Sequence, residues 1–250
     1  MKDFVFYKGA NNAEALEFAK ELLAGFGEYR VTAENHVEKC KGAGAVLFCS
    51  ENAFRLAKEL RFHTVARLFR RNLFTDAYAK DTESGIKRGS AGREAYDVIR
   101  YPELEIEKTV RSAYEWAEKY DKSIVAVDLA DVLETGKLWR FVAQDVAQDY
   151  PNVRTQYELL SDFLYQSRAE NNNEDIILTN RLVGGIISQV FCAENHFSGE
   201  TVCLFNDTTF AAYGSEKPFM RREEVTKAIA WALRESFDRP DQAEWLTNKQ

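Results

Sequence analysis

The chain of 250 residues carries a formal net charge of −7, and 45% of its residues are hydrophobic. This length and composition allow a sizeable buried core, arranged in one large domain or two modest ones. The acidic balance and the lack of a basic run argue against nucleic-acid binding, because phosphates require clustered lysine and arginine. Without a membrane-spanning run or a signal-peptide pattern, we expect a soluble protein of the cytoplasm, or of an organelle matrix after processing.

Predicted strands and helices alternate along the chain. The sequence predicts four strands, at residues 4–7, 45–48, 123–127 and 153–159, of which the first two are apolar runs typical of buried strands. Apolar residues at helical spacing predict four helices, over residues 16–27, 56–60, 102–117 and 138–146. This alternation favours an α/β fold with parallel strand pairs.

One stretch breaks the pattern. Between Thr82 and Tyr96 the sequence places Gly85, Gly89 and Gly92 among charged residues. Glycine-rich polar segments of this kind are typical of mobile surface loops. A loop of this length is usually functional or disordered, so the composition leaves its role open.

The four cysteines lack the Cys-x-x-Cys spacing of a metal or redox motif and the density of a disulfide scaffold. Cys40, Cys49, Cys192 and Cys203 have mainly apolar, strand-like neighbours. We therefore expect buried, reduced thiols, with a redox or zinc role as the alternative.

A set of short segments gives the chain a family resemblance, because they recur in one order and at one spacing. They are Ile124, residues 127–134, residues 138–140, Tyr150–Pro151, Asp162 and residues 175–180. Together they resemble the isocitrate and isopropylmalate dehydrogenases, the β-decarboxylating family.

The resemblance implies a truncated form of that family's two-domain α/β sandwich. Residues 63–195 would form a central α/β dimerisation domain with an arm near residues 82–98 that clasps a second subunit. Residues 1–62 and 196–250 would together build a reduced terminal α/β domain.

Active members of the family use NAD(P) and Mg²⁺ or Mn²⁺ to oxidise a 2-hydroxy acid that then loses a β-carboxylate. By the resemblance, Gly185 and Gln189 stand where two metal-binding aspartates should be, and Leu129 stands where the proton-transferring lysine should be. Asp162 remains as a residual metal ligand, and one carboxylate is too few for a tight site. The alternative is that Asp162 caps the helix that follows it.

Part of the substrate pocket is retained. Arg67 matches one of three substrate-carboxylate arginines, while Ala57 and Lys80 stand at the other two positions. Lysine keeps the positive charge but loses the bidentate grip of arginine. Tyr101 matches a tyrosine that acts late in the reaction, so it is either a residual catalytic proton donor or a packing residue. The glycine-rich motifs of nucleotide binding are missing, and no cofactor is predicted.

The helix that follows Asn180 is apolar on all sides, which indicates burial against more than one neighbour. Gly184 and Gly185 would let another helix approach closely. We therefore expect an obligate homodimer built on this helix and the arm.

Two functional hypotheses follow. The first is a catalytically degenerate member, or pseudoenzyme, that acts as a dimeric structural, regulatory or small-carboxylate-binding protein for a di- or tricarboxylate. The alternative is an NAD(P)-dependent, metal-requiring 2-hydroxy acid dehydrogenase with an altered site, or a non-catalytic subunit that pairs with a companion dehydrogenase subunit. Kinship of fold alone does not decide between them.

Overall fold

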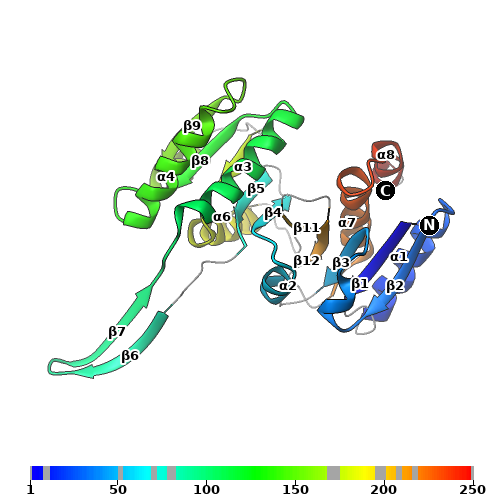
Figure 1. The fold of residues 1–250 in the computed structure, drawn as a ribbon, viewed down its shortest axis with the longest axis horizontal. Coiled ribbons are helices and arrows are strands. Elements are labelled where there is room, and N and C mark those ends of the chain that lie inside the picture. Colours follow the sequence, from blue (N-terminus) through cyan, green and yellow to red (C-terminus); the bar gives the residue numbers. More distant parts are fainter. Residues whose placement is uncertain are drawn as a thin grey trace.

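The computed structural model describes residues 2–7, 12–49, 53–68, 72–77, 83–167, 175–194, 201–206, 210–215 and 219–248. Within these residues one mixed sheet of ten strands runs through the whole molecule (Figure 1). In spatial order the strands are β2 (Tyr29–Glu34), β1 (Lys2–Tyr7), β3 (Ala45–Cys49), β12 (Ala211–Ser215), β11 (Thr201–Phe205), β4 (Thr64–Leu68), β5 (Asn72–Asp76), β10 (Ile176–Leu178), β8 (Ile124–Asp128) and β9 (Thr155–Leu159).

Most neighbouring strands are parallel, and the exceptions lie at the centre of the sheet. β11 is antiparallel to both β12 and β4, and β4 is antiparallel to β5. The outer pairs on both sides are parallel, as strands joined through helices require. The predicted α/β fold with parallel pairs is confirmed.

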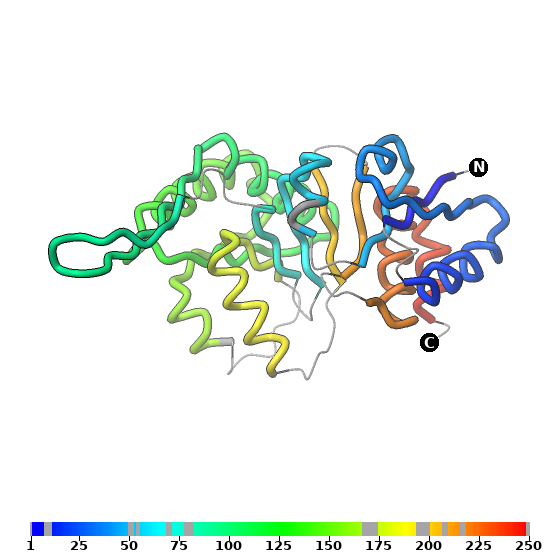
Figure 2. The backbone as a smooth tube through the Cα atoms, turned by 90° about the horizontal axis from the view of Figure 1, so that it is seen from below, coloured from blue at the N-terminus to red at the C-terminus, as the bar shows by residue number. Residues whose placement is uncertain are grey.

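Helices cover both faces of this sheet, so its central strands are apolar on both sides. One face is covered by α1 (Ala13–Ala24), α3 (Glu103–Lys119), α4 (Glu134–Ala147), α7 (Arg222–Glu235) and α8 (Pro240–Asn248). The other face is covered by α2 (Ala53–Leu60), α5 (Leu160–Ser167) and α6 (Arg181–Glu194). Figure 2 shows α5 and α6 side by side, on the opposite side of the sheet from α3 and α4.

Local signals explain where several helices begin and end. Asn12 caps α1 by accepting a hydrogen bond from the Ala15 backbone N–H at 3.4 Å. That helix ends at Ala24, and Gly27 follows with φ +71°, a conformation that favours glycine. α4 begins at Glu134, four residues before the predicted start at Leu138. The prediction missed this first turn because the turn is polar and shows no apolar periodicity.

Residues 83–98 form a β-hairpin, in the stretch where composition alone predicts a mobile surface loop and the resemblance predicts an arm. β6 (Glu83–Gly89) pairs antiparallel with β7 (Gly92–Val98), and the hairpin projects away from the sheet (Figure 1). Its Ile86 side chain is 74% exposed. The role of this hairpin as a clasp between subunits stays a prediction.

The sheet is continuous across the boundary that the resemblance implies between the two domains. A division at residues 62/63 and 195/196 separates β11 from β4, yet these strands are hydrogen-bonded neighbours. The two-domain division therefore stays a prediction, and its boundary would fall between two hydrogen-bonded strands of one continuous sheet.

Three of the four cysteines are buried, and Cys192 on α6 is partly exposed, against the expectation for that residue. Burial raises the pKa of the Cys40 thiol to about 11 and also raises the pKa of Cys49. A raised pKa keeps a thiol protonated and weakly nucleophilic. In the part of the chain that the structure describes, no helix is long and apolar enough to cross a membrane.

Candidate functional site

The carboxyl ends of β5, β10 and β8 lie side by side on one edge of the sheet, because these three strands are parallel neighbours. Polar residues stand at each end: Asp76 closes β5, Asp128 closes β8, and Asn180 follows β10. All three side chains are at most 5% exposed. In open α/β sheets the carboxyl ends of the strands are where ligands bind, so this edge is the candidate site.

Asp76 is the most perturbed acid at this edge. Its carboxylate accepts a hydrogen bond from the Arg181 backbone N–H at 2.7 Å, at the start of α6. The Tyr101 hydroxyl lies 3.3 Å from both carboxylate oxygens. Burial raises the pKa of Asp76 to about 6, although the contacts with Arg181 and Tyr101 act in the opposite direction. The sequence analysis missed Asp76, because its strand was not predicted.

Tyr101 packs as well as hydrogen-bonds. Its ring meets Trp139 of α4 edge-on, with centroids 5.9 Å apart. Burial, and then the neighbouring Asp76 carboxylate, raise the pKa of Tyr101 well above its usual range. The hydroxyl therefore stays protonated at neutral pH and is directed at Asp76.

Arg67 and Tyr101, predicted to share a substrate pocket, lie on opposite faces of the sheet. The Arg67 guanidinium approaches the Thr75 hydroxyl at 3.3 Å, whereas Tyr101 approaches Asp76. Thr75 and Asp76 are successive residues of β5, and successive strand side chains point to opposite faces. Lys80, the third predicted member, lies outside the described residues. The structure does not bring these residues together into one pocket.

The two positions predicted to have lost metal ligands lie on α6, and the predicted residual ligand Asp162 lies on α5. Gly185 and Gln189 are exposed on α6, and a side chain added at Gly185 would meet open space. Leu129 packs against the apolar cluster beneath these helices. Asp162 is exposed in the first turn of α5, which begins at Leu160. The interpretation of Asp162 as a helix cap is wrong, because it lies inside the helix.

The surviving carboxylates do not form a metal-binding group. Among the described residues no three His, Cys, Asp or Glu side chains lie close enough together to hold a metal ion. Mg²⁺ and Mn²⁺ prefer several hard oxygen ligands. Within one subunit, the described side chains alone do not supply such a set of ligands. The segments that stand where the family has its cofactor-binding loops, residues 7–12 and 204–218, lie partly outside the described residues, at positions 8–11, 207–209 and 216–218.

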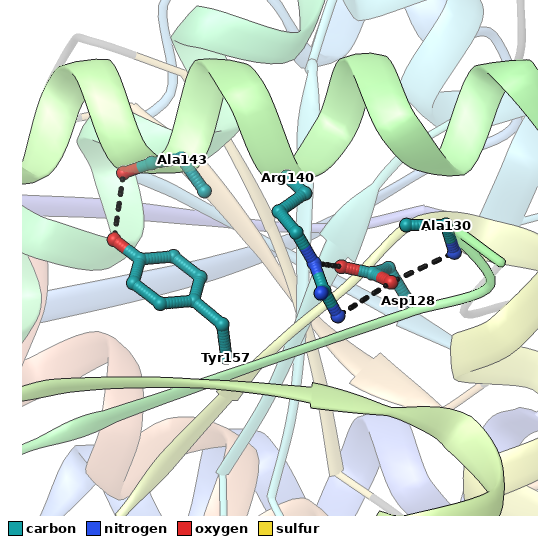
Figure 3. Close-up of polar contacts among 5 residues, drawn as sticks. All are labelled: Asp128, Ala130, Arg140, Ala143 and Tyr157. Carbon is teal, nitrogen blue, oxygen red and sulfur yellow. Dashed lines mark hydrogen bonds and ion pairs between the residues drawn. The ribbon is translucent and has the colours of Figure 1, made fainter.

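Asp128, which precedes Leu129, forms a structural ion pair. Arg140 of α4 donates two hydrogen bonds to its carboxylate, at 2.7 and 3.0 Å, and the Ala130 backbone N–H donates a third at 2.8 Å (Figure 3). These bonds hold the turn from β8 into α4. A Cβ added at Gly136 would lie 2.7 Å from the Leu129 backbone, so this turn also requires a small residue. Part of the recurring sequence pattern thus serves the fold.

The two glycines of α6 have different roles. A Cβ at Gly184 would lie 2.3 Å from the Thr75 side chain, so this glycine lets α6 pack onto β5 of its own subunit. Gly185 faces open space. The expectation that both glycines admit a second helix is wrong for Gly184.

The sequence pattern of the isocitrate/isopropylmalate dehydrogenases matches residues 30–195, more than half of the chain. The chain belongs to this family. A 3-isopropylmalate dehydrogenase of Bordetella parapertussis is 34% identical over 123 residues, covering 47% of this chain and 34% of that relative. A 3-isopropylmalate dehydrogenase of Zymomonas mobilis is 28% identical over 224 residues, covering 72% of this chain and 64% of that relative. The matches thus span between a third and just under two thirds of these two relatives.

Solved structures extend the likeness of this family member to almost the whole chain. An isocitrate dehydrogenase from Methylococcus capsulatus superimposes with a TM-score of 0.78 at 13% identity, covering 98% of this chain and 88% of that one. A β-decarboxylating dehydrogenase from Thermococcus kodakarensis gives a TM-score of 0.76 at 16% identity, covering 99% and 89%. At these identities the likeness shows the fold, which is the predicted family fold in a shorter form.

Proposed function

We propose that this chain is a catalytically degenerate member of its family that acts as a non-catalytic, dimeric subunit. The observation that carries the proposal is the side-chain chemistry of α6. Where the family resemblance calls for two aspartates, the exposed surface of this helix presents Gly185 and Gln189. Glycine and glutamine supply no negative charge, so Asp162 would be the only carboxylate of the three positions to hold a divalent metal.

The acid–base groups support the same proposal. Leu129 has no titratable group where the family resemblance calls for a lysine. Tyr101 keeps its proton and directs it at Asp76. Arg67 is buried on the opposite face. The direct test is turnover: the protein should not reduce NAD or NADP with isocitrate, isopropylmalate or malate, with or without Mg²⁺ or Mn²⁺.

The apolar surface of α6 supports the dimeric part of the proposal. Leu182 and Ile186 are 47% and 41% exposed, one helical turn apart, and Tyr165 of the neighbouring α5 is 83% exposed. Apolar surface left exposed on adjacent helices is typical of an interface with another chain. The partner is a second copy of this chain, or a companion dehydrogenase subunit in the alternative form of the proposal.

Ile187 does not test this interface, because it is fully buried inside the subunit. A charge at that position would cost several kcal/mol in the monomer itself. Ile186→Glu places the charge on the exposed side of the same helix and leaves the subunit core intact.

Sedimentation should give the wild type about twice the subunit mass of 28.7 kDa, and Ile186→Glu should shift it toward that mass at micromolar concentration. Phe141→Glu is the matched control, because Phe141 is a 54% exposed apolar residue on α4, on the opposite face of the sheet. It should remain dimeric. A stable wild-type monomer that binds no companion chain, or an Ile186→Glu dimer as tight as wild type, would contradict this interface.

A further inference from the structure

A groove with a volume of about 320 Å³ lies between the end of α3 and the middle of α7. It opens beside the last residue of β4 and the first residues of β5 and β10. These lining residues belong to, or pack against, the core on the α3 and α7 side of the sheet. The groove therefore lies on the opposite face from Arg67 and α6.

The inner wall of the groove is apolar and aromatic. Trp116 of α3 and Trp231 of α7 stack with ring centroids 5.5 Å apart and an interplanar angle of 14°. Leu68 and Ile176 line the same wall. Phe74 meets Trp116 edge-on at 5.0 Å, which holds the tryptophan pair in place from beneath.

The charged residues that line this groove are all basic. Lys122 follows α3, and Lys227 and Arg234 lie two helical turns apart on α7. No carboxylate is among the lining residues that the structure describes, although the whole chain carries a net charge of −7. Lys227 also pairs with Glu223 on the exposed side of α7, where solvent screens the interaction.

The neighbouring groove has a different balance of charge. Beyond the tryptophan pair, a second groove of about 300 Å³ is lined by Glu115 and Glu235 together with Lys119. Glu235 is bonded to Lys119 at 2.9 Å and also accepts a hydrogen bond from the Tyr120 hydroxyl. Of these two grooves, only the one at the end of α3 has an excess of basic lining residues, and we call it the basic groove.

We propose that the basic groove binds a small organic anion, with its carboxylate or phosphate among Lys122, Lys227 and Arg234 and its apolar body against the two tryptophans. Its volume lies at the lower end of the roughly 300–1,000 Å³ found for small-molecule pockets. Apolar walls with a few converging charges supply affinity and orientation respectively. The proposed anion site does not depend on the proposed loss of catalysis, because none of its lining residues is among the positions that the family resemblance assigns to catalysis, substrate or metal.

Calorimetry with 2-naphthoate and 2-naphthyl phosphate tests the proposal and distinguishes the two anionic groups. Acetate measures the affinity for an anionic group that has no apolar body. The cation 2-naphthylmethylammonium measures the affinity for the same apolar body with a positive charge. We expect the naphthyl anions to bind at least about tenfold more tightly than acetate or the naphthyl cation.

The variant Lys227→Gln/Arg234→Gln should weaken binding of the naphthyl anions about tenfold. Its control, Lys20→Gln/Lys108→Gln, removes the same charge from two exposed helical positions outside the groove and should change the affinity less than about twofold. The proposal is overturned if no naphthyl anion binds at millimolar concentration. It is also overturned if acetate binds equally well, or if the control weakens binding as much as the groove variant.

Discussion

The buried carboxyl of Asp76 makes a measurable prediction about stability and pH. Its pKa rises from 3.8 to about 6 on folding, chiefly because burial disfavours the charged form. Between these two values the folded protein keeps a proton that the unfolded chain releases. Stability therefore falls as the pH rises through this window. A difference of about two pKa units corresponds to about 3 kcal/mol, lost between about pH 4 and pH 7.

Asp76→Asn removes this titration and keeps an oxygen that can accept the hydrogen bond from the Arg181 backbone. Relative to wild type, the variant should gain about 3 kcal/mol of unfolding free energy between pH 4 and pH 7. Urea unfolding at several pH values measures this difference. Asp145→Asn, at an exposed position on α4, is the control and should show no comparable gain. A constant difference between Asp76→Asn and wild type across this range would refute the reasoning.

Two further predictions concern the turn from β8 into α4. Arg140→Gln should lower the unfolding free energy by about 3 kcal/mol, because it leaves the buried Asp128 carboxylate without its charged partner. Urea unfolding indistinguishable from wild type would show that this ion pair contributes nothing. Gly136→Ala should cost about 1–3 kcal/mol through contact with the Leu129 backbone, whereas Gly185→Ala should stabilise its helix by up to about 1 kcal/mol. Equal thermal shifts for the two glycine variants would contradict the assigned packing.

Apolar periodicity predicted several of the helices and several of the buried strands, because those patterns are local. Ile124–Asp128 and Glu103–Lys119 are clear examples. Two of the missed strands have weak signals: Tyr29–Glu34 carries mostly polar residues at one edge of the sheet, and Ile176–Leu178 is only three residues long. The buried strand Ala211–Ser215 and the helix Arg222–Glu235 were also not predicted. The hairpin at residues 83–98 was missed because its residues are largely exposed and show no apolar alternation.

The candidate site was predicted only in part, for a related reason. Family resemblance identified Tyr101 and Arg67 along the chain, but which face of the sheet each occupies depends on the strand register. Asp76 can be recognised as a site residue only from its contacts with Tyr101 and Arg181, which lie 25 and 105 residues away in the sequence. The basic groove likewise joins α3 to α7, which lie on the same face of the sheet but far apart in the sequence. Such contacts between distant residues leave no local pattern in the sequence.

Turnover tests the central claim most directly. Purified protein is assayed for NADH and NADPH formation with isocitrate, isopropylmalate and malate, each with Mg²⁺, Mn²⁺ or no metal. Because Leu129, Gly185 and Gln189 supply neither a base nor a carboxylate for the metal, we expect no substrate-dependent formation above the rate without protein. The variant Asp162→Ala should behave in the same way. Metal-dependent turnover that disappears in Asp162→Ala would contradict the claim that this member of the family has lost catalysis.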